Sequence, residues 1–242
     1  MLRRFFLALQ FLTISPSFWK GELWPEDLGR SVAFYPLVGA LIGGTIWGVA
    51  ALAGNGVTLG IKAFLPLVTW VVITGALHVD GFLDSCDGLF GGMTPERRLE
   101  IMHDVHYGSF ALAGGAMLFL GKYAGLQAIG TSSILLLIPV LGRWGMALSI
   151  WVFPYARKEG LGKAVKDGMR AIDLAAALLT SLLISALFGW KGLAAWGIGT
   201  ASALAVGKYA SAKLGGGITG DIYGAVCEVT ELATLLGIAV LQ

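Results

Sequence analysis

Seven long apolar segments dominate this chain of 242 residues and constrain its fold more than any other feature. A helix that crosses a bilayer core needs about 20 mainly apolar residues. The composition agrees, since 56% of the residues are hydrophobic and only 13% are charged, against about 25% charged residues in a soluble domain. We therefore expect an all-α, polytopic integral membrane helix bundle of about seven transmembrane helices, near residues 32–53, 60–79, 109–129, 132–153, 172–190, 192–212 and 222–241.

The segments outside these spans are short and predict cytoplasmic or interfacial helices. Residues 1–14 place Arg3 and Arg4 before an apolar run, and no small-residue cleavage site follows. This pattern indicates a retained interfacial helix and not a removed signal peptide. We expect residues 1–242 to form a single integral membrane catalytic domain.

Basic residues fall almost entirely on one side of the predicted membrane. The opposite side carries only Lys62 and Lys191. The positive-inside rule therefore predicts a cytoplasmic N-terminus and an external C-terminus, which requires an odd number of spans. The net charge of +2 gives no argument for a nucleic-acid partner. The twelve basic residues of the cytoplasmic side are Arg3, Arg4, Lys20, Arg30, Arg97, Arg98, Arg157, Lys158, Lys163, Lys166, Arg170 and Lys213.

The densest polar cluster, residues 78–88, follows the second predicted span directly. At about 100° per residue, Asp80, Asp84 and Asp87 share one helical stripe. Three close carboxylates repel one another unless a cation lies among them, and oxygen ligands suit a hard ion such as Mg²⁺. Mg²⁺ with open positions is the usual arrangement for binding a diphosphate. The alternative is a solvated helix end, although unpaired acids are costly at a membrane mouth. His78 is a candidate proton acceptor.

A second polar segment follows at residues 91–108. Thr94 is a predicted N-cap and Pro95 suits the first position of a short helix. Asp104 lies so close in sequence to the aspartate stripe that we take it as a fourth candidate metal ligand. The arginines of this segment, Arg97 and Arg98, are either phosphate ligands or solvated charges of an interfacial helix.

Ionisable residues also fall inside the predicted spans, namely Lys122, Arg143, Lys208, Glu228 and Glu231. Each is costly at that depth without a partner or a wet cavity. One interpretation is an interhelical ion pair, for instance Arg143 with Glu228. The other is a charged lining of a substrate cleft, with Arg143 as a phosphate ligand. Lys122 and Lys208 are alternatively long enough to extend to the interface.

A glycine-rich run at residues 214–220 precedes the last predicted span. Such a loop at a helix N-terminus offers free backbone N–H groups to an anion. Gly216, Thr219 and Gly220 are therefore candidate phosphate or nucleotide ligands, and Asp221 lies where an N-cap is expected. Glu228 shares the helical face of Asp221. A glycine run by itself is also compatible with a simple flexible turn.

Together these segments resemble the cobalamin synthase family, the adenosylcobinamide-GDP ribazoletransferases, over nearly the whole chain. The family's pattern has a basic residue two positions after Asp104, where this chain has His106. The resemblance is carried, in order, by Arg30, residues 35–39, 78–88, 99–104, 159–162 and 214–221, and by Gly224, Ala225 and Glu228.

The resemblance implies a Mg²⁺-dependent transferase of the cell inner membrane whose active site faces the cytoplasm. Its reaction joins adenosylcobinamide-GDP to α-ribazole or α-ribazole 5′-phosphate, and GMP leaves, as the final assembly step of cobalamin biosynthesis. The partners are then these small molecules and membrane lipid, with no nucleic acid, and the sequence leaves a homo-oligomer open. The implied catalytic residues are His78, Asp80, Asp84 and Asp87; the metal ligands are Asp80, Asp84, Asp87 and Asp104; the phosphate or substrate ligands are Arg30, Arg143, Gly216, Thr219, Gly220, Asp221 and Glu228.

Three other functions compete with this interpretation. The acid-rich cluster is similar in style to that of the CDP-alcohol phosphotransferases, which make lipids, but the Ala-Arg step after the second aspartate of that family is missing here. A cation or corrinoid transporter would need polar residues on both membrane faces, whereas the external loops are nearly uncharged. A membrane scaffold would leave the acid stripe unexplained.

Overall fold

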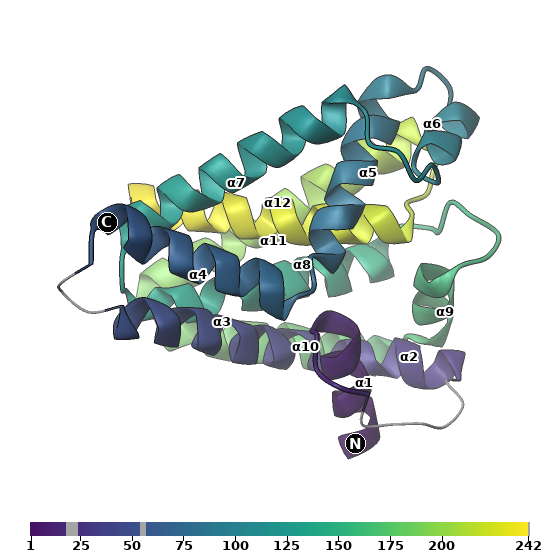
Figure 1. The fold of residues 1–242 in the computed structure, drawn as a ribbon. Coiled ribbons are helices and arrows are strands. Elements are labelled where there is room, and N and C mark those ends of the chain that lie inside the picture. The colour runs from purple at the N-terminus through teal and green to yellow at the C-terminus, as the bar shows by residue number, and fades with distance from the viewer. Residues whose placement is uncertain (18–23, 54–56, 242) are drawn as a thin grey trace.

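Helices make up nearly all of the regular structure in the computed structural model, which describes residues 1–17, 24–53 and 57–241 (Figure 1). Within these ranges the strand-like pairing is one isolated parallel bridge, between Tyr155 and Ile218. The all-α prediction is confirmed. The helices are α1 (Leu2–Leu12), α2 (Pro25–Ser31), η1 (Val32–Phe34), α3 (Tyr35–Leu52), α4 (Leu59–Ile73), α5 (Leu77–Gly91), α6 (Pro95–Ile101), α7 (Ser109–Ile129), η2 (Ser133–Leu136), α8 (Leu137–Val152), α9 (Leu161–Gly168), α10 (Ala171–Ala186), α11 (Gly189–Lys213) and α12 (Gly220–Val240).

Four helical segments are long and apolar enough to cross a membrane by themselves, namely Pro25–Leu52, Ser109–Ile129, Ser133–Val152 and Gly220–Val240. Two bent pairs, α4 with α5 and α9 with α10, raise the number to six when each pair is taken as one span. The chain is therefore a polytopic membrane helix bundle. Each of the seven predicted segments contains a helix, but the count of seven spans is not confirmed. The predicted segment near 192–212 corresponds to α11, which is rich in Gly and Ala.

The short helices α2, α6 and α9 gather at one end of the bundle, and the C-terminus lies at the other (Figure 1). The C-terminal end of α11 joins the first group, because Arg98 donates a hydrogen bond to the Lys213 carbonyl at 3.0 Å. Loops that carry the basic residues thus meet at one end, as the charge pattern predicts. Lys20 lies outside the described residues, and the side of the membrane that this end faces stays a prediction.

The second predicted span is broken where its polar cluster begins. α4 ends at Ile73 and α5 starts at Leu77, and the two axes meet at 89°. The turn between them includes Ala76 with a φ of 56°, in the left-handed region. A sharp break of this kind lets α5 present acids at the end of the bundle and not in its apolar middle.

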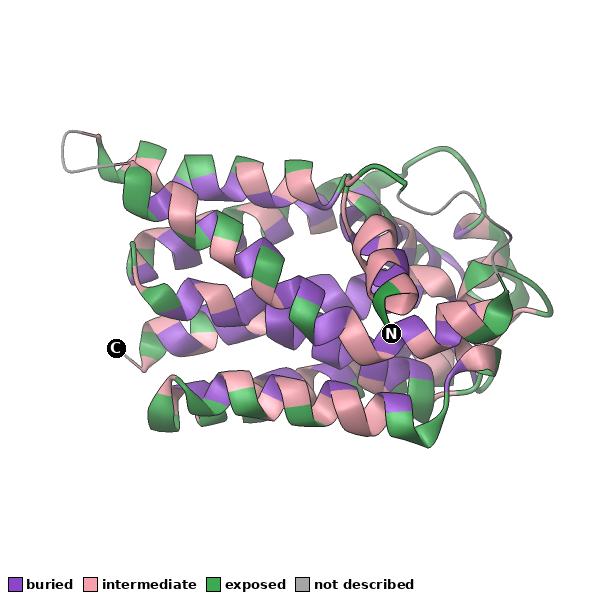
Figure 2. Ribbon diagram, turned by 90° about the horizontal axis from the view of Figure 1, so that it is seen from below, coloured by how far each residue is buried: buried purple, intermediate pink, exposed green. Residues whose placement is uncertain are grey.

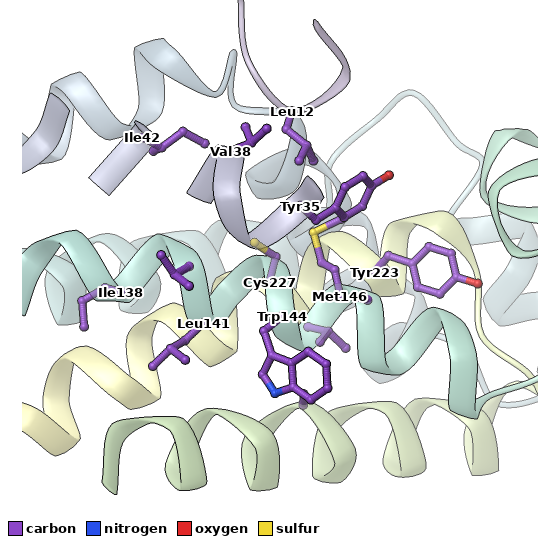
Figure 3. Close-up of a cluster of buried hydrophobic side chains, with 14 of the residues drawn as sticks. Leu12, Tyr35, Val38, Ile42, Ile138, Leu141, Trp144, Met146, Tyr223 and Cys227 are labelled. Atoms are coloured by element: carbon purple, nitrogen blue, oxygen red, sulfur yellow. The ribbon is translucent and has the colours of Figure 1, made fainter. Parts of the chain in front are cut away.

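α8 and α12 form the buried centre of the bundle, and exposed residues lie on the outer faces of the surrounding helices (Figure 2). Leu141 and Trp144 of α8 and Cys227 of α12 are among the core side chains (Figure 3). Large apolar side chains such as Leu112 and Leu183 are exposed on the outside. An apolar exterior of this extent suits a lipid environment.

Four charged side chains pair inside the bundle. Lys122 Nζ lies 2.6 Å from Glu228 Oε2 and 2.7 Å from Glu231 Oε2, and Arg143 pairs with Glu231. None of the four is more than 3% exposed. Two positive and two negative charges balance, and Lys122 also lies 4.2 Å from the ring centroid of Trp70. We refer to these four residues as the buried charge network, and it joins α7, α8 and α12.

The interhelical ion pair expected for Arg143 is therefore present, but with Glu231 and not with Glu228. The reason is the close approach of α8 and α12 at Gly142, where an added Cβ would lie 2.6 Å from Glu231 Cγ. Lys122 does not extend to the interface either, because the two glutamates hold it in the interior.

The buried charge network predicts a large effect of Lys122→Met on stability. The substitution leaves two buried carboxylates against a single arginine, so we expect the free energy of unfolding to fall by about 3–5 kcal/mol. Lys208→Met is the matched control, because Lys208 is exposed on α11, and it should stay within about 0.5 kcal/mol of the parent chain. Denaturant titration in detergent micelles measures both. Equal stabilities of the two variants would contradict the network.

Candidate active site

α5 and α12 cross at two glycines, and this crossing builds the site. An added Cβ at Gly81 would lie 2.8 Å from the Asp221 carbonyl oxygen, and one at Gly224 would lie 3.0 Å from the His78 carbonyl oxygen. Backbones can approach this closely only where side chains are absent. The contact brings the first turn of α12 beside the first turn of α5, and so places Asp80 next to Asp221.

A polar pocket of about 460 Å³ opens at this crossing. We refer to it as the acid pocket. Its lining includes four carboxylates, from α5, from the loop after α6 and from α12, and among the described residues Arg157 is its one Lys or Arg. The residues that define its chemistry are Asp80, Asp84, Asp104, Tyr107, Arg157 and Asp221.

Three of the four carboxylates have protein partners. The Tyr107 hydroxyl donates a hydrogen bond to Asp80, and Arg157 Nη2 lies 3.0 Å from Asp221 Oδ2. Asp104 accepts hydrogen bonds from the backbone N–H and, at 2.8 Å, from the ring of His106.

Asp84 differs from these three. Within the described part of the chain no hydrogen bond or ion pair to its carboxylate is found, although it lines the same pocket. It is therefore the carboxylate that is available to a ligand.

Two loop residues show the electrostatic character of the acid pocket. The hydrogen bond to Asp80 raises the pKa of Tyr107 to about 12, so its hydroxyl stays protonated and donates. The side-chain hydrogen bond from His106 holds the pKa of Asp104 below its ordinary value, so this carboxylate stays ionised near neutral pH. His106 itself is 87% exposed at its side chain, and it acts on the pocket through Asp104.

Asp87, predicted as a metal ligand and catalytic residue, is not brought to the acid pocket. Its Oδ2 accepts a hydrogen bond from the Gly108 backbone N–H at 2.6 Å and its Oδ1 one from Ala111 at 2.9 Å. It is 7% exposed. At about 1.5 Å per residue, Asp87 lies roughly 10 Å further along α5 than Asp80. Asp87 lies on the same helical face as Asp80 and Asp84, but its carboxylate meets the N-terminus of α7 and caps that helix.

The glycine-rich loop is held by backbone pairing. Ile218 N–H donates to the Pro154 carbonyl at 2.8 Å, and Ala156 N–H donates to the Ile218 carbonyl at 2.9 Å. This pairing brings the loop after α8, and with it Arg157, beside Asp221. The loop after α8 therefore supplies Arg157 to the acid pocket, a role that the sequence did not indicate.

The sequence predicts Asp221 as the N-cap of α12, and this prediction is wrong. Thr219 is the N-cap, and its hydroxyl oxygen accepts from the Ile222 N–H at 3.4 Å. Thr219 is fully buried, and Gly216, with a φ of 106°, lies on the outside of the loop. Of the predicted phosphate ligands in this segment, Asp221 lines the acid pocket, whereas Gly220 lines a neighbouring cavity.

Four other predicted site residues lie apart from the acid pocket. Arg30 pairs with Glu26 on α2. Arg143 and Glu228 belong to the buried charge network. His78 is 3% exposed and lines the same neighbouring cavity as Gly220. Of the four predicted metal ligands, Asp80, Asp84 and Asp104 are brought together, and Asp221 takes the place expected for Asp87.

Sequence reasoning missed Tyr107 and Arg157 as site residues. Tyr107 stands beside the helix-starting Gly108, and Arg157 stands among several basic loop residues. The available signal was their position in the sequence. Tyr107 lies a few residues after the resemblance segment 99–104, and Arg157 lies just before the segment 159–162. Nothing in the spacing indicates which of the loop cations faces the carboxylates.

The donor set of the acid pocket fits a hard divalent cation. In the described ranges, no three His, Cys, Asp or Glu side chains lie close enough to hold a metal ion by themselves. Mg²⁺ is usually held by one or two carboxylates plus substrate phosphates and water, so it needs fewer protein ligands. Asp84, which has no partner within the described part of the chain, and its neighbour Asp80 can supply such oxygens.

Comparisons with known proteins show which family the chain belongs to. The family model described as cobalamin-5-phosphate synthase matches residues 4–239. The chain is 36% identical to an adenosylcobinamide-GDP ribazoletransferase of Desulfitobacterium hafniense, over 98% of this chain and 96% of that one. It is 39% identical to proteins of the same name from Pseudomonas fluorescens (97% and 98%) and Pseudomonas syringae pv. syringae (98% and 99%). No solved structure matches the chain.

The cap formed by Asp87 makes a prediction that separates it from Asp84. Asp87→Ala removes the acceptor of two backbone N–H groups, so we expect a loss of about 1–3 kcal/mol in unfolding free energy. Hydrogen exchange should accelerate at residues 108–111. Asp167→Ala, at an exposed position of α9, is the control and should change neither. Unaltered exchange at the start of α7 would show that Asp87 is not its cap.

Proposed function

Because the chain belongs to the cobalamin-5-phosphate synthase family, we propose that this transferase joins adenosylcobinamide-GDP to α-ribazole or α-ribazole 5′-phosphate and releases GMP. In this proposal the reaction takes place at the cytoplasmic face of the cell inner membrane and depends on Mg²⁺. The observation that carries the proposal is the acid pocket, where Asp80, Asp84, Asp104 and Asp221 meet Arg157 at the end of a membrane bundle that bears the basic loops.

The proposed reaction is a phosphoryl transfer. A ribose hydroxyl that α-ribazole and its 5′-phosphate both carry, and therefore not the 5′-hydroxyl, attacks the phosphorus that bears cobinamide, and a new phosphoester bond forms. The phosphoanhydride bond breaks, and GMP leaves with its electron pair. The hydroxyl proton passes to a carboxylate. Mg²⁺ supplies charge neutralisation on the diphosphate and on the departing GMP when it is bound.

The residues of the acid pocket divide this work. Asp84 is available to ligate the ion or to accept the hydroxyl proton, because no protein group is found on it in the described ranges. Tyr107 holds Asp80 in position by a hydrogen bond. Arg157 presents a guanidinium, which binds phosphate oxygens with two parallel donors, and its ion pair with Asp221 keeps it at the pocket.

The competing functions gain no support from the comparisons. The relatives named above share one transferase name, and it is not that of a lipid enzyme or a transporter. A product assay separates the proposed reaction from that of a lipid-forming enzyme, and uptake of a cation or corrinoid into sealed vesicles tests the transporter. Purified chain in nanodiscs receives Mg²⁺ and either CDP-diacylglycerol with a polyol or adenosylcobinamide-GDP with α-ribazole, and we expect GMP and a joined corrinoid only from the second pair.

Asp84→Asn tests the metal or base role. We expect turnover to fall by at least about 10–100-fold, the range for loss of a group that supports a metal ligand, while thermal stability is retained because Asp84 has no hydrogen-bond or ion-pair partner among the described residues. Asp167→Asn removes the same charge from an exposed position and should keep parental turnover. Product is measured by chromatography of the corrinoid and of GMP. Near-parental turnover of Asp84→Asn would remove this role.

Arg157→Gln tests phosphate binding. Loss of a charge-assisted hydrogen bond to the diphosphate should lower kcat/KM for adenosylcobinamide-GDP by about 10–100-fold. The adjacent Lys158→Gln makes the same change in net charge at an exposed residue, and we expect less than a twofold effect. Equal effects of the two substitutions would mean that only the overall charge of the loop matters.

A further inference from the structure

A second cavity adjoins the acid pocket. It has a volume of about 210 Å³ and lies among α1, α3, α5, α8, α9 and α12. Asp80 and Asp221 line both cavities. A ligand that occupies both cavities therefore passes these two carboxylates. One of its ends then lies among apolar side chains and the other among charged ones. We call the second cavity the apolar pocket.

The walls of the apolar pocket are mainly aliphatic and aromatic. Tyr35, Met146 and Tyr223 come from three different helices, and Figure 3 shows both tyrosine hydroxyls turned to the same side. The other walls come from α1, α5, α8 and α9, with Phe11, Leu77, Ile150 and Val165. Surfaces of this kind favour a flat apolar ring and disfavour a phosphate.

Two buried polar atoms of this pocket have no partner. His78 Nε2 and the Tyr223 hydroxyl lack a hydrogen bond within the described residues, and the two side chains are 3% and 4% exposed. A buried polar group without a hydrogen-bond partner destabilises the folded chain. Such groups beside a cavity indicate that a ligand supplies the missing partners.

Size and polarity select among the parts of the two proposed substrates. Drug-sized ligands occupy pockets of about 300–1,000 Å³, so 210 Å³ suits a single small ring system and not a corrinoid. Guanine carries several donors and acceptors on its edges, and most of them would be unpaired among these walls. The ribazole base is a benzimidazole, a flat apolar bicycle with one free ring nitrogen, which matches one hydroxyl donor.

We infer that the apolar pocket binds the aromatic base of the nucleoside acceptor, with the Tyr223 hydroxyl donating a hydrogen bond to its free ring nitrogen. This inference rests on the proposed function and adds the acceptor's place in it. With the base in the apolar pocket, the ribose lies between Asp80 and Asp221. The attacking ribose hydroxyl then enters the acid pocket, where Asp84 and the diphosphate meet it. His78 completes the polar lining beside the base.

The experiment combines a protein change with a ligand change. Tyr223→Phe removes the hydroxyl alone, and 1-ribosylindole replaces the free ring nitrogen of the base by a CH group. Isothermal titration of the full chain in nanodiscs with α-ribazole or ribosylindole measures binding without turnover. Tyr209→Phe is the control, because Tyr209 is 44% exposed on α11.

We expect the parent chain and Tyr209→Phe to bind α-ribazole about 3- to 10-fold more tightly than ribosylindole. Tyr223→Phe should bind both ligands equally, at the weaker affinity. In steady-state assays its KM for α-ribazole should rise by the same factor, while its KM for adenosylcobinamide-GDP stays unchanged. Leu161→Trp, at a half-exposed position of the pocket wall, narrows the cavity without disturbing the core and should raise only the KM for α-ribazole.

The two proposals fail in different ways. Absence of transfer by the parent chain, with titrations as expected, would overturn the proposed function and leave the base pocket supported. If the parent chain carries out the transfer but Tyr223→Phe still binds α-ribazole more tightly than ribosylindole, the base pocket alone would be overturned. A selective rise in the KM for adenosylcobinamide-GDP in Leu161→Trp would likewise assign the pocket to the other substrate and contradict the inference.

Discussion

The close crossing of α5 and α12 is the constraint on which the rest of the site depends. Gly81 and Gly224 leave no side chain between the two backbones. Two segments that lie far apart in the sequence therefore contribute neighbouring aspartates. The same contact creates the boundary that the acid pocket and the apolar pocket share, since Asp80 and Asp221 line both. A larger residue at either glycine would push the two helices apart, and so would move Asp80 away from Asp221 and change the shape of both cavities.

Charged groups in this protein serve two separate purposes, and position in the bundle separates them. Lys122, Arg143, Glu228 and Glu231 balance one another in the interior. Their pairing satisfies charges that lipid and core would not tolerate, and it joins three helices. The acid pocket lies at the end that carries the basic loops, with carboxylates in excess over its arginine. An excess of negative charge at an accessible position is what a divalent cation neutralises.

The aspartate stripe shows how far periodicity reaches. Helical spacing correctly predicted that Asp80, Asp84 and Asp87 point in one direction, and Asp80 and Asp84 do line one pocket. It could not predict that Asp87, two turns further on, meets the N-terminus of α7, because that meeting depends on where α7 packs. Likewise the sequence indicated a charged loop after the fourth span, but backbone pairing between residues 154–156 and 218 selects Arg157 for the pocket.

The sequence by itself determined the all-α membrane architecture, the end at which polar chemistry gathers, and the family resemblance. Each of these follows from local properties, namely the length of apolar runs, the distribution of charge and the order of short segments. The tertiary structure decided which charges are partners, which aspartates share a pocket, and that an apolar cavity adjoins them. Those outcomes depend on contacts between α5, α7, α8 and α12, and such contacts are set by side-chain packing over distances that no local pattern encodes.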